Sequence, residues 1–167
     1  TFFSNGAVAH VTMADPFCNN LSRLLIEVGE PLMPEGRQLH RNGTYLAMEG
    51  PAFSTKAESN LYRNWGCAVI GMTNHTEARL AREAEIAYTS IAMATDYDCW
   101  HESEESVSVE MVIDNLRKNA EVANKIVTSA AEKISNSRPT SSAHNALKFG
   151  LMTAKDNVPS LTRKKLN

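Results

Sequence analysis

The sequence has few of the features that mark secreted proteins or membrane proteins. Its 167 residues contain only three cysteines, Cys18, Cys67 and Cys99, an odd number at wide spacing. This pattern argues against a disulfide framework or a zinc motif and favours a reducing compartment, the cytoplasm, with the nucleus as an alternative. No apolar run approaches the roughly 20 residues of a membrane-spanning helix, so no membrane partner is expected.

Positive charge is also sparse and scattered. The chain has 17 lysines and arginines against 19 acidic residues, which gives a formal net charge of −2. Apart from a short basic run at 163–165, no cluster gives one face the positive field that binding to nucleic acid requires. Hydrophobic residues make up 43% of the chain, enough for the core of one ordinary domain. The composition therefore predicts a globular domain with no nucleic-acid partner.

Short apolar runs alternate with amphipathic segments along the chain. Four runs rich in apolar or β-branched residues are expected to be strands: 7–11, 44–48, 67–72 and 86–95. Four segments with apolar residues at every third or fourth position are expected to be helices: 21–28, 56–65, 75–84 and 109–127. A last helix is expected to begin near residue 143. This order predicts an α/β fold in which helices cover both faces of parallel strands.

Two polar side chains come at the ends of expected strands. Thr73 follows the run at 67–72, and Asp96 follows the run at 86–95. Ligands gather at the carboxyl ends of parallel strands, so both residues are candidates for a binding site. The apolar neighbours of Asp96 predict partial burial, which favours a neutral carboxyl that can donate a hydrogen bond. A helix cap or a salt bridge accounts for this aspartate equally well.

Residue types that bind metals also gather near this point. They are Asp96, Asp98, Cys99, His101 and Glu102. Side chains alternate in direction along an extended segment, and no second cluster completes a ligand set. A metal site is therefore not expected.

Three further features fit ordinary structure as well as a binding site. His10 lies inside an expected strand, where a histidine is usually structural, and Phe53 follows a turn that an aromatic ring can anchor. Val109, Val112 and Ile113 have the spacing of a buried helix face. None of these features predicts a site by itself.

Four segments carry a specific resemblance to a known family. Their sequences are MEGPAFSTKAES at 48–59, VIGMTN at 69–74, EARLAREA at 77–84 and ATDYDCW at 94–100. They resemble the methylthioadenosine phosphorylases of the trimeric purine nucleoside phosphorylase family, and the similarity extends from 10–18 to 144–148. The resemblance implies that residues 1–167 are the C-terminal part, about three-fifths, of a single phosphorylase domain. The family's main phosphate-binding elements precede the matched stretch.

The resemblance also implies a fold, a reaction and partners. The fold is an α/β domain, incomplete here, with a twisted mixed sheet flanked by helices, and the assembly is a homotrimer. The reaction is phosphorolysis of 5′-methylthioadenosine in purine and methionine salvage. Phosphate attacks C1′, adenine leaves, and 5-methylthioribose 1-phosphate forms. Phosphate is a co-substrate, and no cofactor is expected.

Residue by residue, the resemblance assigns contacts to the purine base. Asp96 matches the acid that contacts N7 and the 6-amino group, and Asp98 matches a second acid that supports Asp96 or shares its proton. Negative charge collects on the departing purine, so an acid at N7 stabilises the transition state more than the ground state. Phe53 matches the aromatic residue beside the base.

Further matches concern the sugar, the phosphate and the neighbouring subunit. Met72 matches a methionine that contacts the ribose, and Thr73 matches a hydroxyl that holds phosphate. His10 matches a histidine that reaches a neighbouring subunit's site. Three residues of one helix face match the wall of the 5′ pocket: Val109, Val112 and Ile113. An apolar wall suits a methylthio group better than a hydroxyl.

Two departures from the family pattern and two alternative functions stay open. Gly71 stands where some members have asparagine, which bears on a base contact, and His75 with Thr76 replaces the usual apolar residue and proline. A general purine nucleoside phosphorylase is the nearest alternative, although Asp96 and the apolar wall argue against it. The other alternative is a truncated form that binds or regulates without catalysis.

Overall fold

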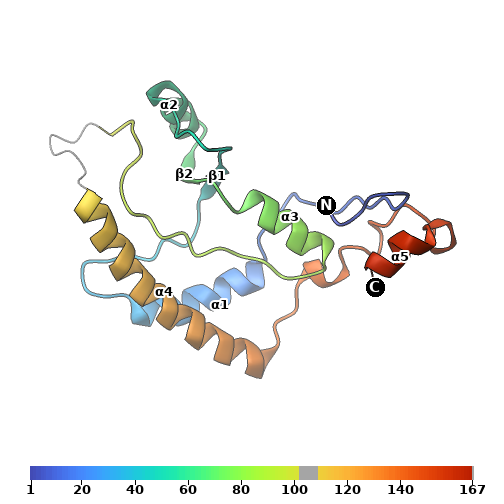
Figure 1. The fold of residues 1–167 in the computed structure, drawn as a ribbon. Helices are drawn as coiled ribbons and strands as arrows, with labels where there is room; N and C mark the ends of the chain where they lie inside the picture. The colour runs from blue at the N-terminus through green and yellow to red at the C-terminus, as the bar shows by residue number, and fades with distance from the viewer. Residues whose placement is uncertain (102–108, 167) are drawn as a thin grey trace. The chain divides into compact units, whose positions relative to one another are not determined.

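The computed structural model describes residues 1–101 and 109–166 of the chain (Figure 1). The helices and strands follow in the order α1 (Asn19–Gly29), β1 (Thr44–Ala47), α2 (Lys56–Asn64), β2 (Cys67–Gly71), α3 (His75–Glu83), α4 (Val109–Ser137) and α5 (Ser160–Leu166). Short 3₁₀ turns lie at Glu30–Leu32, Ser142–Asn145 and Lys155–Asn157. Four of the five expected helices are confirmed as α1 to α4, and two of the four expected strands are confirmed as β1 and β2. The helix expected from about residue 143 is wrong, because a short 3₁₀ turn lies at Ser142–Asn145.

The contacts between residues divide the chain into two compact units. The first unit comprises Thr1–Arg23, His75–Ser90 and Pro139–Asn167, and the second comprises Leu24–Asn74 and Ile91–Arg138. The residues that the sequence assigns to base, sugar and phosphate all belong to the second unit, whereas His10 belongs to the first.

The second unit contains a β1–α2–β2 segment. β1 and β2 pair in parallel, with Leu46 opposite Ile70 and Ala47 opposite Gly71. Tyr45 lies diagonally across from Gly71, and its hydroxyl occupies the space that a side chain at 71 would need. The tyrosine therefore gives a structural reason for glycine at this position, where some family members have asparagine.

α2 begins at a reciprocal cap between Thr55 and Glu58. The hydroxyl Oγ1 of Thr55 accepts from the Glu58 N–H at 3.2 Å, and Glu58 Oε2 accepts from the Thr55 N–H at 2.8 Å. These bonds satisfy backbone donors that the first helical turn leaves free. The Thr55 hydroxyl also donates to Glu58 Oε2 at 2.8 Å, and the donations from the Thr55 backbone and hydroxyl lower the pKa of the Glu58 carboxyl because they favour its charged form.

α4 is a long amphipathic helix that holds the segment before it through side-chain amides. Asn115 Nδ2 donates to the carbonyl of Thr95 at 3.1 Å, and Asn119 Nδ2 donates to that of Ala94 at 2.7 Å. Farther along, Ile126 and Ala130 are buried. No helix within residues 1–101 or 109–166, this one included, is long and apolar enough to cross a lipid bilayer.

Two expected strands do not form. Instead of a strand at 7–11, Ala9 makes an isolated antiparallel bridge with Leu151. The run 86–95 has no assigned strand. Within it, the Tyr88 carbonyl accepts a hydrogen bond from the Cys18 N–H at 2.7 Å. A strand needs a neighbour to complete its hydrogen-bond ladder, and the described sheet consists of β1 and β2. An apolar run indicates a tendency to be buried but does not supply that neighbour.

Charged side chains buried in the first unit are paired with backbone groups. Arg82 and Glu83 on α3 are each only 7% exposed. Arg82 Nη2 donates to the carbonyl of Asp15 at 2.5 Å, and Glu83 Oε2 accepts from the Phe2 N–H at 2.7 Å. Because a buried charge requires hydrogen-bond partners, these bonds attach the N-terminal segment to α3.

Candidate active site

Met72 and Thr73 directly follow β2 at its carboxyl end. Both side chains are exposed, Met72 to 45%, and the Met72 methyl group lies against Gly50 in the loop after β1. The Met48 N–H donates to the Gly71 carbonyl at 2.9 Å and extends the strand pairing to this edge. The carboxyl ends of parallel strands meet at one edge, so the expected place of Thr73 at a strand end is confirmed.

Two aspartates on the segment 95–101, called the acid loop below, have different surroundings. Asp98 is half-buried, and its Oδ2 accepts from the hydroxyl of Ser59 on α2 while its Oδ1 accepts from the Cys99 N–H at 2.9 Å. Asp96 is exposed, and its Oδ1 accepts from its neighbour Thr95 Oγ1 at 2.6 Å. The loop therefore carries one anchored carboxylate and one that faces solvent.

The expected partial burial of Asp96 at the end of a strand is wrong. The preceding residues 86–95 form no strand, and residues 92–94 are themselves exposed. The apolar run predicts a covered strand, but burial depends on what packs over a segment as well as on its own composition.

The acid loop also contains an aromatic cluster. The Tyr97 and His101 rings stack with their centres 4.4 Å apart, and Trp100 meets both edge to face. On α2, the Arg63 guanidinium lies 3.9 Å from the centre of the Trp100 ring, within range of a cation–π interaction. The cluster attaches the acid loop to α2.

Ser59 and Arg63 were not predicted from the sequence as site residues. Both lie on α2 one helical turn apart, and both contact residues about 40 positions later in the chain, 39 in the case of the Ser59–Asp98 bond. The available signal was their spacing of four residues, which places them on one helix face. Nothing in the sequence indicated what that face would contact.

The three residues expected to wall the 5′ pocket lie at the start of α4 and are largely uncovered. Val109 is 70% exposed and Ile113 is 59% exposed, while Val112 is half-buried. The prediction that these three residues form a buried helix face is wrong, since the buried positions of α4 are Ile126 and Ala130. Phe53, expected beside the base, is 85% exposed.

His10 is exposed in the first unit, where its N–H donates to the Gly150 carbonyl at 2.7 Å. His10 lines a hollow of about 290 Å³, together with Asp15, Arg82, Asn145 and Phe149 among others. The structure therefore places His10 at a surface depression and not inside a strand.

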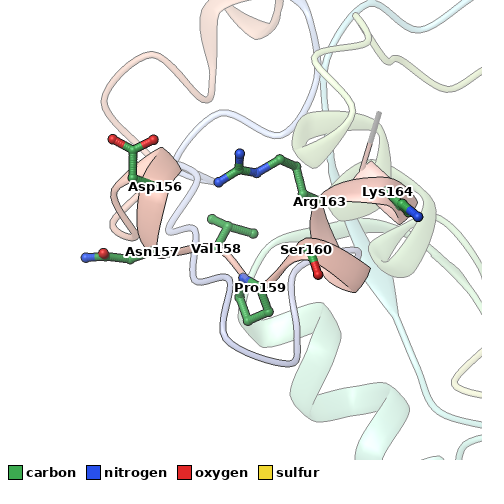
Figure 2. A pocket seen from close by; sticks show the side chains of 7 residues that line it. All are labelled: Asp156, Asn157, Val158, Pro159, Ser160, Arg163 and Lys164. Carbon is green, nitrogen blue, oxygen red and sulfur yellow. The ribbon is translucent and has the colours of Figure 1, made fainter.

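A second hollow in the first unit, of about 530 Å³, surrounds the start of α5 (Figure 2). The Arg163 side chain points toward Val158, and its guanidinium donates to the Lys155 carbonyl. Lys164 points the opposite way. None of the residues that the sequence assigns to the active site lines this hollow.

The metal-ligand types near the acid loop form no metal site in the described part of the chain. Across residues 1–101 and 109–166, no group of three or more His, Cys, Asp and Glu side chains has a geometry that holds a metal ion. Glu102, one of the five residues considered, lies outside the described residues.

The fold and the acid loop together define a class of protein. A parallel β–α–β segment with polar side chains after its carboxyl end, and one carboxylate, Asp98, anchored to the connecting helix, is typical of an α/β domain that binds a ligand at this edge. The model of the phosphorylase superfamily matches residues 1–132. The chain belongs to this superfamily, as an incomplete α/β domain of nucleoside phosphorylase fold.

Known relatives agree with this placement. The chain is 70% identical over 167 residues to the S-methyl-5′-thioadenosine phosphorylase of Prochlorococcus marinus, and 52% identical to that of Thermosynechococcus vestitus. Both alignments include 100% of this chain, but they include only 53% and 58% of the respective relatives. A crystal structure of methylthioadenosine phosphorylase from an Antarctic soil metagenomic library matches with a TM-score of 0.93 and 45% identity. That match covers 99% of this chain and 57% of the other.

The comparisons confirm the resemblance on which the residue assignments rest. The chain spans little more than half the length of these two curated relatives.

Proposed function

We propose that the protein containing this chain catalyses phosphorolysis of 5′-methylthioadenosine to adenine and 5-methylthioribose 1-phosphate. The observation that carries the proposal is the acid loop, in which Asp98 is fixed by α2 and Asp96 is left facing solvent. The names of the relatives, at up to 70% identity, supply the substrate class.

Asp96 is the proposed acid at purine N7. As the bond between C1′ and N9 breaks, its electron pair moves into the purine ring, and a proton or hydrogen bond at N7 stabilises that charge. A protonated carboxyl donates to N7 while its other oxygen accepts from the 6-amino group of adenine. Exposure of Asp96 leaves its carboxyl accessible to such a base.

Three exposed side chains are proposed to hold the rest of the nucleoside and the phosphate. Phe53 packs beside the base, Met72 contacts the ribose, and the Thr73 hydroxyl binds the phosphate that attacks C1′. Their positions in the second unit, after β1 and after β2, support this division. No cofactor takes part in the proposed reaction.

The start of α4 is proposed to give specificity for the methylthio group. Val109, Val112 and Ile113 offer an apolar surface without a hydrogen-bond partner for a 5′-hydroxyl. The intact protein is proposed to act as a homotrimer in the cytoplasm, within purine and methionine salvage, with His10 reaching the site of a neighbouring subunit.

The test is a direct assay of the intact protein with methylthioadenosine and phosphate, in which free adenine is measured. Phosphate-dependent release of adenine is expected, with a higher kcat/KM than phosphorolysis of inosine. Faster turnover of inosine would instead favour a general purine nucleoside phosphorylase. Binding of methylthioadenosine without any release of adenine would favour a non-catalytic role.

A further inference from the structure

One face of α2 holds the acid loop at two points. The Ser59 hydroxyl donates to Asp98 Oδ2, and Arg63 stacks on the ring of Trp100 at 3.9 Å. Ser59 and Arg63 are four residues apart, so they project from the same side of the helix. The helix thus fixes positions 98 and 100 of the loop.

Ser59 is suited to orient a carboxylate. Its side chain is only 1% exposed, so its hydroxyl has little access to water and depends on a hydrogen bond within the protein. That bond goes to one oxygen of Asp98, while the other oxygen accepts from the Cys99 N–H at 2.9 Å. With both oxygens engaged, the Asp98 carboxylate has one orientation.

We propose that Ser59 is a positioning residue for phosphorolysis, acting through Asp98 to set the place of Asp96. This inference rests on the proposed function. Asp96 and Asp98 are two residues apart, a reach of at most about 7 Å of extended chain, so a shift of the anchored aspartate is passed to the exposed one. A misplacement of about 1 Å at a reacting group can lower a rate by roughly a hundredfold.

The Arg63–Trp100 contact makes it possible to distinguish orientation of Asp98 by Ser59 from attachment of the loop to α2. It remains when Ser59 is changed, and it keeps the loop on α2. Loss of the serine hydroxyl then frees the Asp98 carboxylate to rotate. The expected consequence is a slower chemical step and not loss of the folded loop.

The experiment compares Ser59→Ala with Thr55→Ala in the intact protein. Thr55 caps the same helix and has no hydrogen bond to Asp98, so its loss weakens α2 without freeing the carboxylate. Ser59→Ala is expected to lower kcat for methylthioadenosine about tenfold or more, with KM changed less than about twofold, as for loss of a hydrogen bond to a charged group. Thr55→Ala is expected to lower the melting temperature while kcat stays within about twofold of wild type.

A double-mutant cycle tests whether Ser59 acts through Asp98. The pair Ser59→Ala and Asp98→Asn is expected to lower kcat no further than Asp98→Asn alone, because the second change removes the group that the serine orients. Ser59→Cys, which nearly keeps the volume but donates weakly, serves if the alanine variant does not fold.

Two results would overturn the positioning role alone. One is a kcat for Ser59→Ala equal to that of Thr55→Ala, and the other is losses that multiply in the double variant. Failure of the wild-type protein to release adenine from methylthioadenosine is a different outcome, because it would overturn the proposed function and the positioning role with it.

Discussion

The acid loop and the first turns of α4 are both assigned to the active site, yet they differ in how the structure holds them. Asp98 has hydrogen-bond donors on both oxygens, and one of these donors is a buried hydroxyl. Val109 and Ile113, by contrast, expose more than half of their surface. A hydrogen-bonded group is fixed by a few directional contacts, whereas an apolar wall is defined only when another surface covers it.

This contrast separates assignments that depend on contacts within the chain from assignments that depend on a ligand or on another surface. The orientation of Asp98 follows from contacts within the second unit, so variants there test contacts that the structure shows. The role of Val112 depends on a bound ligand or on further protein against α4.

The largest effect is expected at Asp96. Asp96→Asn in the intact protein removes the acid at N7, so kcat/KM for methylthioadenosine should fall about a hundredfold or more, the usual scale for loss of a general acid. The asparagine amide suits a 6-oxo purine, so the loss for inosine should be smaller. Steady-state kinetics with both substrates give the answer, and an unchanged kcat/KM for methylthioadenosine would contradict the role of Asp96.

The second effect concerns α4. Val112→Asp places an unpaired charge against the methylthio group, which should weaken binding of methylthioadenosine by about 2 kcal/mol or more. Adenosine, with a 5′-hydroxyl, should lose less. Val127→Asp is the matched control, because Val127 is 54% exposed on the same helix and well beyond its first turns. Equal losses for both nucleosides would show that Val112 has no contact with the 5′ group.

The parts of the fold that the sequence predicts well depend on short-range contacts. The start of α2 is an example, because Thr55 and Glu58 are three residues apart and the side chain of each accepts a hydrogen bond from the backbone N–H of the other. The strand expected at 86–95 was wrong because pairing depends on a distant partner. Ser59 was missed for the same reason, since its partner Asp98 is 39 residues away. Resemblance supplied roles for single residues, but not the helix that orients them.

The third prediction concerns Gly71, at the end of β2 directly before Met72. A Cβ at Gly71 would collide with the Tyr45 hydroxyl and would lie 2.8 Å from Cζ of that ring. Gly71→Ala should therefore lower the free energy of unfolding by about 1–3 kcal/mol, as overpacking does. The same change in a Tyr45→Val background should cost less, because the ring is gone. Urea unfolding measures both, and an equal cost in the two backgrounds would argue against the Tyr45–Gly71 contact.

The smallest effect is expected at Glu58, which caps the helix that anchors the acid loop. The pKa of its carboxyl is lowered in the folded protein because Thr55 donates to it from the backbone and the hydroxyl. A carboxyl whose folded pKa lies below its unfolded value of about 4.3 stabilises the fold above that pH. This contribution is lost as the pH falls through the lower, folded value. Wild type should therefore lose more stability on acidification than Glu58→Gln, whose amide does not titrate.

Urea unfolding at neutral pH and near pH 3 measures this difference for both proteins. Glu132→Gln removes a carboxylate from an exposed position on α4 and controls for the change in net charge. If Glu58→Gln and Glu132→Gln respond to acid alike, the Thr55–Glu58 cap does not hold the charged carboxyl. The start of α2 would then have to be stabilised by the Thr55 hydroxyl alone, through its bond to the Glu58 N–H.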